Sequence, residues 1–538
     1  MHSSTKSNLL VASCYAGILA LGMAVGPKFG HENASAGSGN YLSFLSGKTE
    51  KVEQVLEIIK ENYVDPVKVD TLQNLAIDKI LSHLDPHSSY LPPVKAAEQS
   101  QSLEGNYTGI GIEYFLLNDT ILVTSVKNGP AAKAGISAGD RILRVDNIIV
   151  AGTGVSSAKI VSLIKGRIGT PVKLLIKKRD TLKEQLVSVN RDKITVSSID
   201  AAYMMTPTVG YIKISKFGAR TDEDFALEIS RLKQTNMKSL ILDLRHNGGG
   251  YLNAATALAD EFLPDKQLIV YTQGEHEPRT DYFATATGKF EQGKLVLLVD
   301  ETTASASEIV AGAIQDLDRG IVIGRRSFGK GLVQEQFNFG DGSALNLTIA
   351  RYYTPLGRSI QRPYKMPTEE YFEEVSKRLE SAEVNNDGTT GKDSSSNKHF
   401  SYKTATGRTL YGGGGITPDV YIPVDTTSYN SFYYALRARG ILAEFMYGHL
   451  LEAYKPTSLK QIEDDFRLSD GQYQSLINMA VKSGVKVNSA STKVARAAIN
   501  NDLKASLARV YFDDEAYYKV QNSSDKAITR SLQELKQP

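Results

Sequence analysis

The sequence has one cysteine, no tryptophan and almost no net charge. The single cysteine, Cys14, excludes an intramolecular disulfide, and no cysteine and histidine residues are clustered as metal ligands would be. The 62 Lys and Arg residues nearly balance the 60 Asp and Glu residues, so the formal charge of +2 points to neither a nucleic acid nor an acidic partner. The lack of tryptophan excludes no function. We therefore expect chemistry that rests on the chain's own side chains, with no metal and no other cofactor.

Length and hydrophobic content allow several domains behind a distinctive N-terminal segment. At a typical domain size of about 150 residues, a chain of 538 residues has room for three or four domains. Its hydrophobic content of 41% is enough for a large buried core. After Lys6, the uncharged and mostly apolar run from Leu9 to Val25 covers 17 residues, which is typical of a secretory signal peptide or a short membrane anchor. Cleavage of this segment, its retention as an anchor and lipidation at Cys14 all remain open. In each case we expect the rest of the chain to leave the cytoplasm.

The segment from Lys294 to Gln334 has the clearest chemical pattern. Its apolar run from Leu295 to Val299 predicts a buried strand, and a short turn then leads to a helix that begins near Ser305. A serine at a strand-to-helix turn is well placed for nucleophilic attack, because its hydroxyl can stand clear of the sheet beside the first free helical N–H groups.

Lys330 is the candidate base for this serine. It follows Ser305 by 25 positions, lies between Gly329 and Gly331, and has no acidic neighbour. A lysine acts as a base only when its pKa falls well below the usual value of about 10.4, and burial lowers it. On a strand, Gln334 would point to the same face and could hydrogen-bond the amine without adding charge. The alternative is a surface lysine in a glycine-rich turn.

The sequence Thr303-Ala304-Ser305-Ala306-Ser307-Glu308, with Lys330 and Gln334 at these spacings, resembles the carboxyl-terminal processing peptidases. These are serine peptidases with a Ser–Lys pair, and the resemblance extends over about 51–423. It implies that Ser305 is the nucleophile, Lys330 the general base and Gln334 the residue that orients the lysine. It also implies a core related to ClpP and crotonase. The expected function is a serine endopeptidase that recognises protein C-termini and cleaves near them through an acyl-enzyme.

A second part of the expected site lies in residues 243–250, Asp-Leu-Arg-His-Asn-Gly-Gly-Gly. It resembles the family segment D-L-R-x-N-P-G-G, with Gly248 where proline is usual. The resemblance implies that the N–H groups of Gly249 and Ala306 form the oxyanion hole, in which each donor contributes about 3 kcal/mol. The alternatives are a plain glycine-rich turn and a Ser–His pair that uses His246, although the matching family position is not catalytic.

Residues 105–189 resemble a PDZ domain. Its carboxylate-binding loop corresponds to Gly109, Ile110, Gly111 and Ile112, whose N–H groups suit a terminal carboxylate and whose isoleucines suit an apolar last side chain. We expect residues 157–165 to form the helix that lines the peptide groove, and residues 171–178 to form the closing strand.

The expected fold class is a multidomain α/β protein with an N-terminal helical segment, a PDZ domain, a ClpP/crotonase-like α/β peptidase core and a C-terminal helical region. His87, in a family motif at 84–91, is expected to be a structural turn residue rather than a catalytic one. The predicted segments are 1–25 (signal peptide or membrane anchor), 26–50 (linker), 51–103 (N-terminal helical domain), 104–190 (PDZ domain), 191–424 (peptidase core, with a mobile insertion at about 375–402) and 425–538 (C-terminal helical region).

The expected partners are protein or peptide substrates with free, apolar C-termini, and the membrane through the N-terminal segment. A homodimer and an adaptor protein remain open as further partners. The expected location is the bacterial periplasm, in soluble form or anchored to the inner membrane. A second hypothesis is a non-catalytic PDZ adaptor built on a peptidase scaffold.

Overall fold

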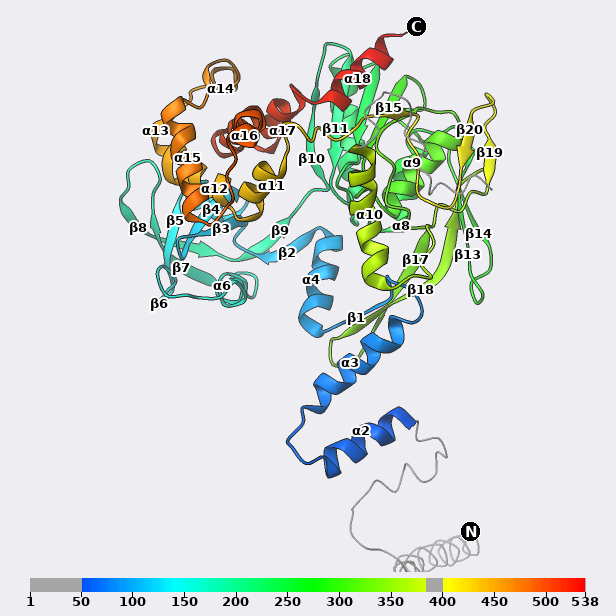
Figure 1. Cartoon of the computed structure of the whole chain (residues 1–538), viewed down its shortest axis with the longest axis horizontal. Coiled ribbons are helices and arrows are strands. Elements are labelled where there is room, and N and C mark those ends of the chain that lie inside the picture. The colour runs from blue at the N-terminus through cyan, green and yellow to red at the C-terminus, as the bar shows by residue number, and fades with distance from the viewer. Residues whose placement is uncertain (1–50, 384–399, 538) are drawn as a thin grey trace, which may run out of the picture. The chain divides into compact units, whose positions relative to one another are not determined.

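The computed structural model describes residues 51–383 and 400–537 (Figure 1). The predicted signal segment and linker, and much of the predicted insertion, lie outside these residues. The chain divides into two compact units, 1–77 and 78–538. The predicted N-terminal helical segment begins with α2 (Lys51–Asn62) and α3 (Val69–Leu81), and no side chain of α2 is buried.

An antiparallel sheet with two short helices forms the predicted PDZ domain. Its strand order is β3–β4–β5–β7–β8, with β6 paired to β5, so β3 lies at an edge. Ser156 caps the groove helix by accepting the N–H of Lys159. Strands β2 and β9 pair beside the sheet. The bounds are β2 (Asn106–Gly109), β3 (Ile112–Leu117), β4 (Thr120–Val126), α5 (Pro130–Lys133), β5 (Arg141–Val145), β6 (Ile148–Ile149), α6 (Ser157–Ile164), β7 (Pro171–Lys177), β8 (Glu184–Asn190) and β9 (Asp192–Thr195).

The peptidase core is built on a six-stranded sheet in the order β10–β11–β12–β15–β16–β21, in which only the β10–β11 pair is antiparallel. Helices cover both faces, which explains why the parallel strands are apolar throughout rather than alternating. Leu240 and Leu242 pack with α7, α8 and α9, whereas Ile241 packs with α18 on the opposite face. The bounds are β10 (Ile199–Met204), β11 (Val209–Ile214), α7 (Thr221–Gln234), β12 (Ser239–Asp243), α8 (Leu252–Asp260), β15 (Lys294–Val299), α9 (Ala306–Asp316), β16 (Ile321–Gly324) and β21 (Val420–Tyr421).

A second sheet carries the lysine side of the expected site. Its order is β1–β18–β13–β14, and β17 also pairs with β18. Strand β1 comes from the segment before the PDZ domain, so residues far apart in the sequence meet in this sheet. The bounds are β1 (Ser89–Leu91), α4 (Pro93–Glu104), β13 (Leu268–Gln273), β14 (Thr280–Phe283), β17 (Leu332–Asn338), β18 (Ala344–Tyr353), α10 (Thr368–Glu383), β19 (Ser401–Lys403) and β20 (Thr409–Tyr411).

The C-terminal region is helical, as predicted. One apolar core joins its helices to Leu117 and Leu122 of the PDZ sheet, and α18 packs on the central sheet of the peptidase core. Among the described residues, no helix has the length and apolarity needed to cross a bilayer. The bounds are α11 (Ser431–Ala438), α12 (Ile441–Phe445), the π-helix η1 (Met446–Leu450), α13 (Leu451–Ala453), α14 (Leu459–Asp465), α15 (Asp470–Lys482), α16 (Ser489–Tyr511), α17 (Asp514–Asn522) and α18 (Lys526–Lys536).

Candidate active site

Ser305 lies in the turn between β15 and α9, as its sequence context predicts. Its backbone has φ 57° and ψ −119°, a conformation that is unfavourable for a residue with a side chain. The preceding turn is fixed by the buried carboxylate of Asp300, which accepts the backbone N–H of Thr302 and of Thr303 at 3.0 Å. The strain is therefore held by a rigid turn, at the residue that the sequence predicts as the nucleophile.

The carboxylate of Glu308 joins the serine turn to the lysine loop. Its Oε2 accepts the backbone N–H of Ser305 at 2.8 Å and of Lys330 at 2.9 Å. Its Oε1 accepts the N–H of Gly329 at 2.7 Å and the hydroxyl of Ser327 at 2.5 Å. Burial raises the pKa of Glu308 to about 7, although these four donors favour the ionised form. The pattern Ser-x-x-Glu at a helix start is that of a capping box, so this contact could have been predicted, but it was missed.

Tyr352, at the end of β18, makes a second link between the two segments. Its buried hydroxyl lies 3.0 Å from the carbonyl oxygen of Ser305 and 2.7 Å from that of Lys330. The backbones of the serine and the lysine therefore share two side-chain partners, Glu308 on their N–H groups and Tyr352 on their carbonyls. This arrangement fixes the two residues relative to one another.

Lys330 and Gln334 are in direct contact. Lys330 Nζ donates to Gln334 Oε1 at 2.6 Å, and burial lowers the pKa of Lys330, with Asp85 and Glu308 opposing the shift. The predicted reason for the contact is wrong, because Lys330 precedes β17 and the register shifts between Val333 and Gln334. A bulge of this kind re-aims a side chain. Among the described residues, no hydrogen bond joins Lys330 Nζ to the hydroxyl of Ser305.

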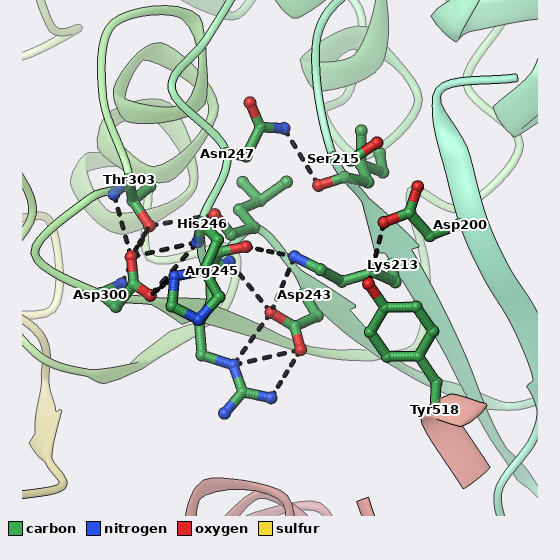
Figure 2. Close-up of polar contacts among 12 residues, drawn as sticks. Asp200, Lys213, Ser215, Asp243, Arg245, His246, Asn247, Asp300, Thr303 and Tyr518 are labelled. Carbon is green, nitrogen blue, oxygen red and sulfur yellow. Dashed lines mark hydrogen bonds and ion pairs between the residues drawn. The ribbon is translucent and has the colours of Figure 1, made fainter. Parts of the chain in front are cut away.

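The segment after β12 is anchored by ion pairs between buried and partly buried side chains (Figure 2). Arg245 forms ion pairs with Asp243 and with Asp525, the N-cap residue of α18, each at 2.6 Å. Burial would raise the pKa of Asp243, but Arg245 and Lys213 hold it well below its ordinary value. Lys213 also donates to the carbonyl of Arg245. The C-terminal helix thus helps to fix the segment that leads to Gly249.

Gly249 lies against the serine turn, and only glycine fits there. Its φ is 103°, and an added Cβ would lie 2.8 Å from Cβ of Ser305. Its N–H donates to Oδ1 of Asn247 at 2.9 Å, and Asn247 also accepts the N–H of Ala304 on its carbonyl. The use of the Gly249 N–H in an oxyanion hole therefore stays a prediction, and it requires this hydrogen bond to open. Ala306 is the first residue of α9, where N–H groups lack a helical acceptor.

Neither histidine considered above bonds to Ser305 within the described residues. The side chain of His246 is 75% exposed, and its Nδ1 lies 2.9 Å from Asp300 (Figure 2). His87 is in the turn before β1, and its Nε2 lies 2.9 Å from the hydroxyl of Tyr371. The geometry therefore gives no support to a Ser–His pair.

The predicted carboxylate loop borders a cavity of about 340 Å³. Val161 and Ile164 of α6 also line it, together with residues of α4. Both loop isoleucines belong to the buried core of the domain, Ile110 with no exposed surface and Ile112 with 9%. Apolar contact with a ligand would come instead from α6. A second cavity, of about 520 Å³, is lined by Gln334 and by residues at the starts of α7 and α8, among them Asp222, Tyr251 and Asn253.

Three parts of this chain match known families. Residues 208–371 match peptidase family S41, residues 108–190 match a PDZ domain, and residues 432–513 match a family of unknown function. A photosystem II D1 C-terminal processing protease of known structure is 24% identical and covers 70% of this chain and 93% of its own. Its TM-score of 0.34 is too low for a comparison of domain arrangement.

The chain aligns with two relatives over enough of their length to assign the family. The chain is 37% identical over 313 residues to a carboxy-terminal-processing protease of Bartonella bacilliformis, across 57% of this chain and 71% of that protein. It is 33% identical over 323 residues to the carboxy-terminal processing protease CtpB of Bacillus subtilis, across 59% and 67%. This chain therefore belongs to the carboxy-terminal processing proteases, serine peptidases of family S41 that carry a PDZ domain.

Proposed function

We propose that the chain hydrolyses peptides by a Ser–Lys acyl-enzyme mechanism. Neutral Lys330 takes the proton of the Ser305 hydroxyl as its Oγ attacks the scissile carbonyl, and the N–H of Ala306 stabilises the resulting oxyanion. Lys330 then returns the proton to the leaving amine, and an acyl ester forms on Ser305. Water, activated by the same lysine, releases the acyl group. The observation that supports this most strongly is the partly buried Lys330–Gln334 contact, linked to Ser305 through Glu308.

We also propose that the PDZ domain binds the free C-terminus of the substrate. The edge position of β3 leaves one side of that strand for an added peptide strand. The adjoining loop offers N–H groups to a carboxylate, and α6 offers apolar side chains to the last residue of the substrate. Export of the protein, a membrane contact through residues 1–25 and a homodimer are proposals from the sequence alone.

Removal of either catalytic group should abolish hydrolysis without unfolding the chain. Ser305→Ala and Lys330→Ala should each lower kcat/KM by at least about 1,000-fold, since nucleophile and base act as a unit. Lys330→Arg should be equally inactive, because arginine keeps its proton. The measurement is cleavage of a fluorogenic peptide, with melting temperatures as the control for folding. A Lys330→Ala variant that retained most of its activity would refute the assignment.

The pH dependence should show a single acidic limb set by Lys330. Burial lowers the pKa of this amine, and only the neutral amine can accept the serine proton. Activity should therefore be present above the lowered pKa and be lost below it. The measurement is kcat/KM from about pH 5 to 9, with circular dichroism at each pH. A flat profile from a folded enzyme would argue against a lysine base.

Glu308→Gln should lower kcat/KM by at least about 100-fold, because an amide nitrogen cannot accept the N–H and O–H groups that face the carboxylate. Glu301→Gln is the matched control. Glu301 lies in the same turn and pairs with Arg325 at 2.5 Å, away from Lys330. The kcat/KM of the Glu301→Gln variant should stay within about threefold of the wild type, as is usual for a change outside the site. Equal effects of the two substitutions would contradict the linking role of Glu308.

Substrate selection should depend on a free C-terminal carboxylate. A protein substrate with an apolar free C-terminus should be cleaved about tenfold faster at low concentration than its amidated form, because tethering raises its effective concentration at Ser305. A peptide too short to reach from the PDZ groove to Ser305 should be cleaved equally in both forms. The measurement is kcat/KM for the four substrates. Equal rates for the two long substrates would remove the PDZ domain from substrate selection.

A further inference from the structure

A tight turn at residues 85–88 lies directly beside Gln334, far from it in the sequence. Gln334 Nε2 donates to the carbonyl oxygen of His87 at 2.7 Å. The turn is held by Asp85, whose Oδ1 accepts the N–H groups of His87 at 2.7 Å and of Ser88 at 2.8 Å. Its Oδ2 accepts the hydroxyl of Ser88 at 2.6 Å. Asp85 and Ser88 are both buried.

The same turn is fixed to the strand opposite Gln334. Thr348 of β18 is the cross-strand partner of Gln334, and its N–H donates to Ser88 Oγ at 3.1 Å. Immediately after the turn, β1 pairs with β18. The position of the His87 carbonyl relative to Gln334 is therefore determined by both Asp85 and the sheet.

We infer that Asp85 and Ser88 are positioning residues for the reaction, because they hold the His87 carbonyl that sets the orientation of the Gln334 amide toward Lys330. This inference rests on the proposed role of Lys330 as the base.

The orientation matters because the glutamine amide has an acceptor end and a donor end. A backbone carbonyl only accepts, so the His87 carbonyl selects the Nε2 end of Gln334. The Oε1 end is thereby left for the amine of Lys330. If the amide turned over, its NH2 group would face the lysine amine, and the carbonyl oxygens of Gln334 and His87 would face each other.

The charges around Lys330 fit this arrangement. Asp85 and Glu308 are the carboxylates that favour its ammonium form. The ring of His87 adds no positive charge near neutral pH, since burial, with Lys330 nearby, lowers the pKa of His87 to about 4. The turn thus places the neutral carbonyl of His87 against Gln334. It brings one negative charge near Lys330, that of Asp85.

The test compares Asp85→Ala, Asp85→Asn and a matched control. Asp341 likewise accepts the N–H and the hydroxyl of a following serine, Ser343, at 2.9 and 2.6 Å. It lies exposed at the far end of the β17–β18 hairpin, so Asp341→Ala removes an aspartate–serine turn away from the site. We expect Asp85→Ala to lower kcat by at least about tenfold with KM changed by less than about twofold, because it misplaces a catalytic group without touching substrate. Asp341→Ala should match the wild type.

Asp85→Asn separates geometry from charge. Its side-chain oxygen can still accept the two backbone N–H groups, so most of kcat should remain. The acidic limb of the pH profile should move to lower pH, because the negative charge that favours the Lys330 ammonium is gone. A role in folding alone would not move this limb. If Asp85→Ala does not fold, Ser88→Ala replaces it, since this variant keeps Asp85 and loses only the hydroxyl contacts; a reduced kcat supports the inference.

Two results would overturn the inference. One is a folded Asp85→Ala variant, or the folded Ser88→Ala variant used in its place, with the kcat of the wild type. The other is a folded Asp85→Asn variant whose kcat falls as far as that of Asp85→Ala, because the charge and not the position of the carbonyl would then account for the effect. Either result, together with an inactive Lys330→Ala variant, would leave the Ser–Lys mechanism in place and remove only the positioning role. An active Lys330→Ala variant would instead refute the mechanism on which the inference rests.

Discussion

The buried carboxylate of Glu308 is the interaction on which the site depends. Two separate segments must meet for a Ser–Lys mechanism, the turn that carries Ser305 and the loop that carries Lys330. Each has backbone N–H groups that neither a helix nor a strand satisfies. Glu308 accepts that of Ser305 on one side and those of Gly329 and Lys330 on the other. An unpaired N–H buried in the core costs about 1–3 kcal/mol, so the two segments are most stable when they share this carboxylate. The same contact that satisfies the backbone therefore determines where Ser305 and Lys330, the proposed nucleophile and base, lie.

This arrangement explains why strain at Ser305 is tolerated. A residue held at an unfavourable φ costs about 1–3 kcal/mol unless its surroundings fix it. Here Asp300 fixes the turn before Ser305, Glu308 accepts its N–H, and Tyr352 lies within hydrogen-bonding distance of its carbonyl. Gly249 packs directly against its side chain and has no Cβ to push it away. The strained backbone of Ser305 is thus held in place by these three side chains and by the close packing of Gly249.

The sequence predicts the local parts of this site and misses the long-range ones. Ser305, Lys330 and Gln334 lie within 30 positions, so their spacing and the strand-to-helix pattern suffice to select them. The strand geometry predicted for Lys330 and Gln334 was wrong, because a bulge is set by pairing with β18 and leaves no periodic trace. The contact of Gln334 with His87 spans 247 positions and depends on how β1 and β17 both pair with β18. No local pattern contains that information. The alternation of strands and helices predicted an α/β core, and the resemblance to known families implied the PDZ domain and the type of core. The contact between Arg245 and Asp525, in contrast, again joins distant segments.

Gly248 stands where the family segment that this stretch resembles has proline, and a glycine makes the backbone of the segment less restricted. A Cβ at this position would meet nothing within 4 Å, so sterics do not require glycine, unlike at Gly249 and Gly250. Glycine here increases the conformational freedom of the unfolded chain and costs about 0.4–1 kcal/mol relative to a compatible proline. The anchors on either side offset this cost. Arg245 is paired with two carboxylates before the glycines, and after them the N–H of Tyr251 donates to the carbonyl of Phe217. One of those carboxylates belongs to Asp525, so the C-terminal helix provides part of the rigidity that proline would otherwise provide within the segment itself.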